Sequence, residues 1–338
     1  MRRTMQPRIA VIGAAFGKWH AREIRRLETK DACRLVALCR KSDKPFDCVY
    51  KAMRDAGLPD DRVAEYLHHG MMLDKGVDAV MVASPAQDHY EHVWDSLEAK
   101  VHVYVEKPVV WSPENDVTMN RRQGEILLEY ALSRDVMLCG GSQFKEWFRE
   151  DGDYWRAVPD VPDHIRSFSM TLATGSGKPL DEMVVDLLPH PLAVLHALAG
   201  SGKLVDFEIK TYPNSRTAVS INATYLPDDG IDVDFNAMLE TTPDRREVSF
   251  VVNGVRVERK EERQPRYKVI LRCDGIEQEV RDPLALANAR FVQDVTRLND
   301  GKSVDKQAEK KSLLHTHEML CDCVTAYERW KQLENRSQ

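Results

Sequence analysis

Several motifs that would identify a function at once are missing from this sequence of 338 residues. It has no CxxC pair and no HExxH motif, which are common signals of a bound zinc ion. No apolar run approaches the roughly 18 residues that cross a bilayer. The 48 basic and 54 acidic residues are spread along the chain, so there is no basic face for nucleic acid. We therefore expect no metal ion, no membrane span and no nucleic-acid partner.

The seven cysteines are an odd number at irregular spacings, which does not suit a disulfide framework. Cys321 and Cys323 are two residues apart on an expected helix, so they point to nearly opposite sides and cannot share a metal ion. The first residues, MRRTMQPRIAVIG, contain an apolar run of strand length only and no cleavage-like segment. We expect reduced, structural thiols and a cytoplasmic protein.

The first 140 residues alternate short β-branched runs with longer amphipathic segments. The short runs are almost continuously apolar, as strands buried on both faces of a parallel sheet are. This alternation predicts a doubly wound sheet with right-handed crossovers, a Rossmann-type α/β domain. The expected strands are 8–13, 34–39, 78–84, 101–106 and 136–141, and the expected helices are 17–29, 45–57, 87–99 and 113–134.

After about residue 145 the pattern changes to period-two alternation with Gly, Pro, Asn and Asp at the breaks. This pattern is typical of an open, mainly antiparallel sheet with one covered face. We therefore expect a Rossmann domain over 1–145 and an α+β domain over 146–338. The expected strands of the second domain are 166–175, 207–213, 218–226, 232–242, 246–254, 255–262 and 266–275, and its helices are 181–200, 283–299 and 305–333.

The stretch GAAFG, residues 13–17, stands where a dinucleotide-binding turn would be. In the usual G-x-G-x-x-G pattern the first glycine permits a tight turn, the second lets the backbone approach a pyrophosphate, and the third lets the helix pack on the strand. Here Gly13 takes the first position, Ala15 the second, and Gly17 opens the helix one residue early. The N–H groups of such a helix start suit an anion. A strand, turn and helix without any ligand is the alternative.

The second strand ends in LCRKSDK, which bears on the choice of cofactor. NAD enzymes commonly carry Asp or Glu here for the ribose hydroxyls, whereas the 2′-phosphate of NADP needs cationic donors. This chain offers Arg40, Lys41 and Ser42, and no acid before Asp43. An arginine can stack on adenine and bind the phosphate with its forked guanidinium. We expect NADP rather than NAD, with ordinary solvated cations after a strand as the alternative.

Two further strands end in residues that packing does not explain. One expected strand ends at Ser84-Pro85 and another at Glu106, directly before Lys107-Pro108. Open α/β sheets bind their ligands at this carboxyl edge. Because lysine rarely goes inside unpaired, Lys107 at the end of a buried strand indicates a site, and an ordinary edge lysine is the alternative.

Asp186 and His190, within VVDLLPHPL, are four residues apart and would share one face of a helix. Three interpretations stay open: a helix-surface pair, half of a metal site, or an acid–base pair in which the carboxylate orients the imidazole. A metal ion would need a further ligand, and no matching motif is present. Pro189 and Pro191 remove backbone hydrogen bonds, so His190 is expected at a helix start or a kink.

In order and spacing these motifs resemble the Gfo/Idh/MocA oxidoreductases, a family that includes glucose–fructose oxidoreductase and inositol dehydrogenase. The resemblance covers nearly the whole chain, and the EKP triplet is its most specific part. The motifs that carry it are the turn from Gly13 to His20, Ser84-Pro85 with His89, Glu106-Lys107-Pro108, and Asp186 with His190.

The resemblance implies a nicotinamide bound between a Rossmann domain and an α+β domain, and a homo-oligomer, a dimer or tetramer, formed through the second sheet. It also implies that Lys107, Asp186 and His190 act on the substrate and that the Lys107–Pro108 peptide is cis, which is seen in about 5% of X–Pro bonds. The residues expected at the cofactor are Gly13, Ala15, Phe16, Gly17, Lys18, Trp19, Arg40, Lys41, Ser42, Ser84, Pro85, His89, Glu106, Lys107 and Gln143.

The chain departs from the family's pattern in three places. The glycine turn is shortened, as in relatives with a G-x-x-F-G turn. Ala86 stands where relatives often have Asn, which removes one cofactor hydrogen bond. The run GGSQF replaces a more usual Asn-Arg-Arg-Phe, so Gln143 and Phe144 are assigned to the nicotinamide end by position only.

The resulting hypothesis is an NADP-dependent oxidoreductase that moves a hydride between the nicotinamide and a hydroxyl- or carbonyl-bearing carbon of a small polar, sugar-like substrate. Lys107 would hydrogen-bond the reacting oxygen, His190 would transfer the proton, and Asp186 would orient His190 or the substrate. A reductase of C=N bonds in secondary metabolism and a non-catalytic NADP-sensing protein are the alternatives. Relatives that reduce imines tend to lose the EKP triplet, which this chain keeps. Residues of the second region that suit a polar substrate are Trp147, Tyr154, Trp155 and Lys178.

Overall fold

The computed structural model forms two compact units, one from residues 1–141 with 284–314 and one from 142–283 with 315–338. This division differs from the expected one, 1–145 and 146–338, because a C-terminal segment returns to the first unit. The roles expected for the two regions stay predictions. The structure describes residues 6–41, 45–158, 160–212, 215–242, 246–262 and 267–337.

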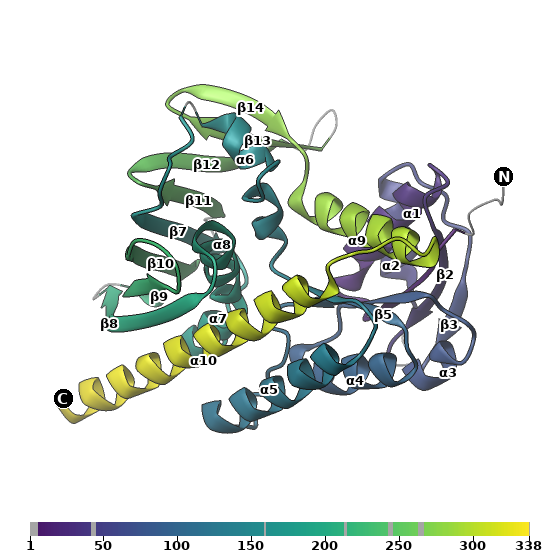
Figure 1. The fold of residues 1–338 in the computed structure, drawn as a ribbon, viewed down its shortest axis with the longest axis horizontal. Coiled ribbons are helices and arrows are strands. Elements are labelled where there is room, and N and C mark those ends of the chain that lie inside the picture. Colours follow the sequence, from purple (N-terminus) through teal and green to yellow (C-terminus); the bar gives the residue numbers. More distant parts are fainter. Residues whose placement is uncertain are drawn as a thin grey trace. The chain divides into compact units, whose positions relative to one another are not determined.

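The first unit contains a six-stranded sheet in the order β3-β2-β1-β4-β5-β6 (Figure 1). Every neighbouring pair is parallel, and the order reverses between β1 and β4. The expected doubly wound Rossmann sheet is therefore confirmed. The strands are β1 (Arg8–Ile12), β2 (Arg34–Cys39), β3 (Ala64–Tyr66), β4 (Ala79–Val82), β5 (His102–Glu106) and β6 (Leu138–Gly141).

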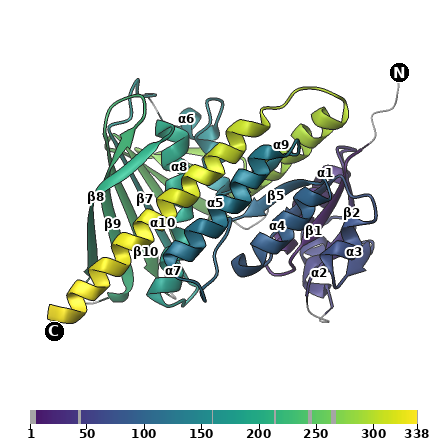
Figure 2. The same cartoon turned by 60° about the horizontal axis from the view of Figure 1, so that its bottom comes forward.

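Helices cover both faces of this sheet because alternate strand residues point to opposite sides. Ile9 and Val11 of β1 pack with α1, α2 and α9, whereas Ala10 and Ile12 pack with α3, α4 and α5. Figure 2 shows α4 and α5 side by side, where rings from both helices stack at 4.1 Å. The helices are α1 (Gly17–Glu28), α2 (Asp47–Asp55), α3 (His69–Leu73), the 3-10 turn η1 (Ala86–Asp88), α4 (His89–Glu98), α5 (Val117–Ser133) and α9 (Pro283–Asn299).

The second unit contains an eight-stranded sheet in the order β14-β13-β12-β11-β7-β10-β9-β8. All neighbours are antiparallel except β7 and β10, which are parallel. The expected open, mainly antiparallel sheet is confirmed. The strands are β7 (Ser167–Thr174), β8 (Gly202–Tyr212), β9 (Ser215–Pro227), β10 (Val233–Thr241), β11 (Glu247–Val252), β12 (Val255–Glu262), β13 (Lys268–Cys273) and β14 (Ile276–Val280).

An aromatic core lies on one face of this second sheet. Trp147 and Tyr154 are 0% and 1% exposed and pack against Phe250. The suggestion that these two side chains suit a substrate is therefore wrong, because they are enclosed in the core. The helical elements of this unit are η2 (Gln143–Trp147), α6 (Asp153–Ala157), α7 (Leu180–Leu187), α8 (Pro189–Ala199) and the His315–Ser337 part of α10 (Lys306–Ser337).

The single helix expected over 181–200 is two helices, α7 and α8, joined at Leu188. Leu188 keeps helical dihedrals, with φ −60° and ψ −31°. The stretch Leu180–Ala199 is long and apolar enough to cross a membrane by length and composition, contrary to the expectation from the sequence. However, 61% of its window is buried within the protein, and a core helix passes the same test.

Candidate functional site

The glycine turn, residues 13–17, joins β1 to α1 and can be built only with glycine at its first position. Gly13 has φ +102°, and a Cβ there would lie 2.3 Å from the carbonyl oxygen of Ala83. Its N–H donates to the carbonyl oxygen of Cys39 at 2.8 Å. At Gly17, a Cβ would lie 3.0 Å from Val11 Cγ1, so glycine lets α1 approach β1 closely. These are the first and third roles of the dinucleotide fingerprint.

The start of α1 is electropositive and carries exposed aromatic rings. Phe16 is the N-cap and forms no side-chain capping bond, and the first turn contains no acidic residue. Phe16 and Trp19 are 38% and 36% exposed. The side chains of Lys18 and Arg22 lie over the Trp19 ring, at 4.9 Å and 4.8 Å from its centroid. The N–H groups of this helix start beside Lys18 suit a phosphate, whereas Arg22 is paired with Glu23 at 2.7 Å.

At the end of β2, the side chain of Arg40 is partly buried. Its guanidinium stacks on the Phe46 ring at 4.7 Å. Nε and Nη2 are buried, and neither has a hydrogen-bond partner among the residues that the structure describes. A buried donor without an acceptor costs about 1–3 kcal/mol, which an anionic ligand would recover.

Lys41 is engaged differently from its neighbour. Its ammonium lies 2.8 Å from Asp88 Oδ1 and 3.3 Å from Glu91 Oε2. The hydrogen bond to Asp88 raises the pKa of Lys41. Part of its charge is thus already compensated. The third residue expected here, Ser42, lies outside the described residues.

A buried histidine joins the ends of β4 and β5. His89 Nε2 lies 2.8 Å from the carbonyl oxygen of Ser84, and Nδ1 lies 2.8 Å from that of Pro108. The ring is 1% exposed, and this burial lowers the pKa of His89. The Lys107–Pro108 peptide is cis, as the resemblance implied. His89 therefore holds two strand ends together; its contact with the cofactor, like that of Pro85, stays a prediction.

Glu106, the last residue of β5, is buried against a second histidine. Its Oε1 lies 2.8 Å from His20 Nε2, and His20 Nδ1 lies 3.1 Å from Asn288 Oδ1. His20 and Asn288 are 0% exposed and Glu106 is 4% exposed. Lys107 follows directly and is half-buried. His20 was quoted in the resemblance without a role, and no local signal could have identified Asn288, 268 residues away.

In the second unit, His190 is the second residue of α8. Pro189 and Pro191 occupy the first turn, where a missing N–H costs nothing, so His190 stays in helical conformation. Its Nδ1 lies 2.8 Å from Ser142 Oγ, and its ring meets the Phe144 ring edge-on at 5.0 Å. The Oε1 of Gln143 is buried without a partner among the described residues. Ser142 was missed because a single serine has no distinctive spacing.

Asp186, near the end of α7, forms an ion pair with Lys178 at 2.7 Å. The carboxylate is 29% exposed and the lysine 41%. The sequence pointed to Lys178 as suitable for a polar substrate, and its ammonium lies on the candidate acid. Helix propagation through Leu188 keeps the four-residue spacing of Asp186 and His190 on one helical path.

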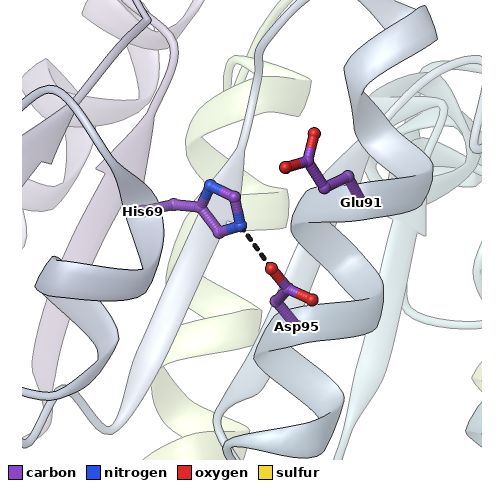
Figure 3. A group of neighbouring side chains, drawn as sticks. All are labelled: His69, Glu91 and Asp95. Atoms are coloured by element: carbon purple, nitrogen blue, oxygen red, sulfur yellow. Dashed lines mark hydrogen bonds and ion pairs between the residues drawn. The ribbon is translucent and has the colours of Figure 1, made fainter.

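One group in the described part of the chain could hold a metal ion. His69 of α3 points toward Glu91 and Asp95, which lie one turn apart on α4 (Figure 3). His69 Nε2 is bonded to Asp95 Oδ2 at 2.7 Å, and Glu91 is paired with Lys41 at 3.3 Å. Since both carboxylates already have cationic or N–H partners and are about half exposed, this group carries no argument for a metal.

The first unit fits a dinucleotide on its own geometry. The Gly13 turn has no room for a side chain, the start of α1 has no capping side chain, and the buried guanidinium of Arg40 lacks an acceptor in the described residues. The first two are features of a pyrophosphate turn, and the third is a cation at the end of the second strand.

Comparison with known proteins agrees with this geometry. Residues 7–126 match a family model described as "Oxidoreductase family, NAD-binding Rossmann fold". D-glucoside 3-dehydrogenase of Escherichia coli (strain K12) is 34% identical over 125 residues, which are 36% of this chain and 33% of that protein. The match thus spans about a third of the length of this curated relative.

Solved structures resemble the chain over nearly its full length. UDP-N-acetylglucosamine 3-dehydrogenase from Acidithiobacillus ferrooxidans has a TM-score of 0.67 and 15% identity, with 95% of this chain and 98% of that chain covered. A 3-ketoreductase from Actinomadura kijaniata, solved with TDP-benzene and NADP, has a TM-score of 0.62 and 19% identity, with 95% and 97% covered. At these identities the likeness shows the fold alone.

Proposed function

We propose that the protein is a member of the Gfo/Idh/MocA family, whose model residues 7–126 match, and an NADP-dependent dehydrogenase or ketoreductase of a sugar-like substrate. The observation that carries the proposal is the glycine turn, where a Cβ on Gly13 would lie 2.3 Å from Ala83 O. The named relatives support the substrate class. Two are 3-dehydrogenases, of a D-glucoside and of UDP-N-acetylglucosamine, and the third is a 3-ketoreductase.

The cofactor would be held by the glycine turn, the start of α1 and Arg40. When bound, the nicotinamide supplies the hydride or accepts it. Lys107 donates a hydrogen bond to the oxygen of the reacting carbon, which favours the negative charge that develops on that oxygen during reduction. The contacts of Ser84, Gln143 and the other residues expected at the cofactor stay predictions.

His190 moves the proton. The Ser142 hydroxyl can bond the imidazole of His190 whether Nδ1 is protonated or bare. Ser142 Oγ accepts the N–H of Phe144 at 3.2 Å. The hydroxyl keeps one donor and one acceptor site for His190 Nδ1, so it can accept from an N–H or donate to a bare nitrogen. The proton then leaves or enters at Nε2. Asp186, held by Lys178, orients the substrate or the imidazole.

A turnover assay tests these roles. The purified protein is supplied with NADP⁺ and a panel of glucosides and sugar nucleotides, and reduced cofactor is followed by absorbance. Lys107→Ala and His190→Ala are each expected to lower turnover about a hundredfold to ten-thousandfold, as loss of proton-transfer groups does. Lys30→Ala, at an exposed position on the same unit, is the control. Full turnover by either variant refutes the assigned role.

Cofactor preference has its own test. Two donors of Arg40 have no acceptor among the described residues, and a hydrogen bond to a charged group contributes about 1.5–3 kcal/mol. Arg40→Ala is therefore expected to weaken NADPH binding about tenfold to a hundredfold. NADH binding should change little. The affinities of both cofactors for both proteins decide the matter, and an affinity for NADH about tenfold above that for NADPH in the unmodified protein contradicts the proposal.

We also place the protein in the cytoplasm as a homo-oligomer, a dimer or tetramer. None of the seven cysteines, all of them in the described residues, is in a disulfide, which suits a reducing compartment. One face of the second sheet carries a polar ladder in which Asn236 bonds Ser169, Ser220 and Asn222 at 2.7–2.9 Å. We propose that this face pairs with a second copy. Asn236→Arg should then yield a monomer in light scattering, Asp229→Arg should not, and a monomeric unmodified protein refutes the pairing.

A further inference from the structure

We propose that His20 and Asn288 are positioning residues that hold the Glu106–Lys107 strand end, through a contact between His20 and Glu106 that contains a proton. The three residues come from α1, β5 and α9, and all belong to the first unit. The importance of Lys107 itself rests on the proposed function.

The orientation of the Asn288 amide is fixed by a backbone carbonyl. Its Nδ2 donates to the carbonyl oxygen of Leu284 at 2.7 Å. A carbonyl oxygen only accepts, so the amide cannot be turned over without setting two oxygens against each other. Asn288 Oδ1 therefore faces His20 Nδ1, at 3.1 Å. Because Oδ1 is also only an acceptor, Nδ1 of His20 must carry a hydrogen.

The other ring nitrogen of His20, Nε2, faces Glu106. A neutral imidazole with a hydrogen on Nδ1 has a bare Nε2. Here Nε2 lies 2.8 Å from Glu106 Oε1, a site that is 4% exposed or less. A bare nitrogen facing an ionised carboxylate at this distance would set two lone pairs against each other, without water to separate them. The contact must hold a hydrogen, either on Nε2 as an imidazolium or on the carboxyl group.

The surroundings of this contact contain few charges that could replace that proton. The Tyr104 ring lies 5.3 Å from the His20 ring, His89 interacts electrostatically with Glu106, and Lys107 follows Glu106 in the chain. The Asn288 amide therefore determines the hydrogen-bonding state of the pair from a helix nearly 270 residues further along the chain.

Both neighbours of Lys107 in the chain are bonded to this group of buried residues. Glu106 Oε2 lies 3.4 Å from the Lys107 N–H, and the next residue, Pro108, is bonded through its carbonyl to His89. The side chain of the residue before Lys107 and the carbonyl of the residue after it are thus each bonded to a buried imidazole, of His20 and His89 respectively. A catalytic lysine displaced by about 1 Å can lose about a hundredfold in rate, so this support affects turnover more than cofactor binding.

Nuclear magnetic resonance of protein labelled with ¹⁵N-histidine tests the proton directly, with no need for turnover. We expect His20 Nδ1 to carry a hydrogen in the unmodified protein. In Asn288→Leu the acceptor is lost, so Nδ1 should become bare and release its proton, leaving one hydrogen on Nε2 that faces an ionised Glu106. In Glu106→Gln the amide can donate to Nε2, so Nδ1 should be protonated and Nε2 bare. A bare Nδ1 in the unmodified protein, or a protonated Nδ1 in the Asn288→Leu variant, overturns the proposal.

Kinetics tests the positioning role. Asn288→Leu is expected to lower kcat about tenfold while the KM for NADPH changes less than about twofold, because the cofactor turn does not depend on Lys107. Gln293→Leu, exposed on the same helix, is the control. Equal losses in thermal stability and in kcat for both variants, with the same His20 tautomer, indicate a structural role only. If no substrate is turned over, the proposed function fails, and the resonance result still decides the proton.

Discussion

The glycine turn of the first unit and the helix pair α7–α8 of the second hold their candidate residues in different ways. At the turn, backbone geometry is decisive: Gly13 sits against Ala83 with no room for a side chain. On the helix pair, side-chain partners are decisive: His190 is set by Ser142, 48 residues away in the chain. A site built from backbone is visible in a short stretch of sequence, whereas a site built from packing is visible only in the fold.

The strongest way to break this comparison is to place a side chain in the turn. In Gly13→Ala the Cβ would meet Ala83 O at 2.3 Å at a φ of +102°, so we expect a loss of about 3 kcal/mol or more in the free energy of unfolding and no NADPH binding. In Gly57→Ala, with φ +67° and no atom within 4 Å, only backbone strain applies, and the cost should be about 1–2 kcal/mol. Urea unfolding and cofactor titration measure both, and equal costs contradict the steric argument.

The next largest effect is acid sensitivity of the first unit, in which His92 of α4 is buried. Burial, with His69 as a smaller cause, lowers the pKa of His92 from 6.5 to about 4. Below about pH 6.5 the unfolded chain binds a proton here and the folded protein does not, so stability falls as the pH drops towards about 4. The loss is at most about 3 kcal/mol.

His92→Gln should remove this part of the acid loss, and His68→Gln, an exposed histidine, should not. Urea unfolding between about pH 7 and about pH 4.5 gives the slope for each protein. The same slope for His92→Gln as for the unmodified protein would show that another group is responsible.

A smaller effect is expected when the partner of His190 is removed. Ser142→Ala leaves Nδ1 without its hydroxyl, so we expect kcat to fall about tenfold with little change in the KM for NADPH. Ser133→Ala, which removes an exposed hydroxyl bonded to Tyr130 O, serves as the control. A full kcat for Ser142→Ala would mean that the Ser142 hydroxyl is not what orients the imidazole.

The smallest change is expected at Lys41. Its ammonium is 55% exposed and already paired with Asp88 and Glu91, and exposed pairs of this kind contribute less than about 1 kcal/mol. Lys41→Ala should therefore raise the Kd for NADPH by less than about fivefold, well below the effect of Arg40→Ala. Equal effects at both positions would show that the two cations share the phosphate.

Prediction from the sequence was accurate where one element carries its own pattern. The five longer strands of the Rossmann sheet are apolar along most of their length and were recognised. β3, with three residues, and α3, with five, were missed because they are too short to show a period. β14, IEQEV, was missed because its side chains are mostly exposed and polar. The helix expected over 181–200 is divided at Leu188, and Pro189 and Pro191 had indicated the helix start at His190 that the structure has.

The sequence by itself determined the order of elements, the glycine turn and the strand ends that carry Arg40 and Lys107, because each depends on neighbours in the chain. Only the tertiary structure decided that α9 covers the first sheet, that Lys178 pairs with Asp186, and that Asn288 and Ser142 bond the rings of His20 and His190. These partners lie up to 268 residues apart, and hydrogen bonds act over about 3 Å of space, whatever the distance along the chain.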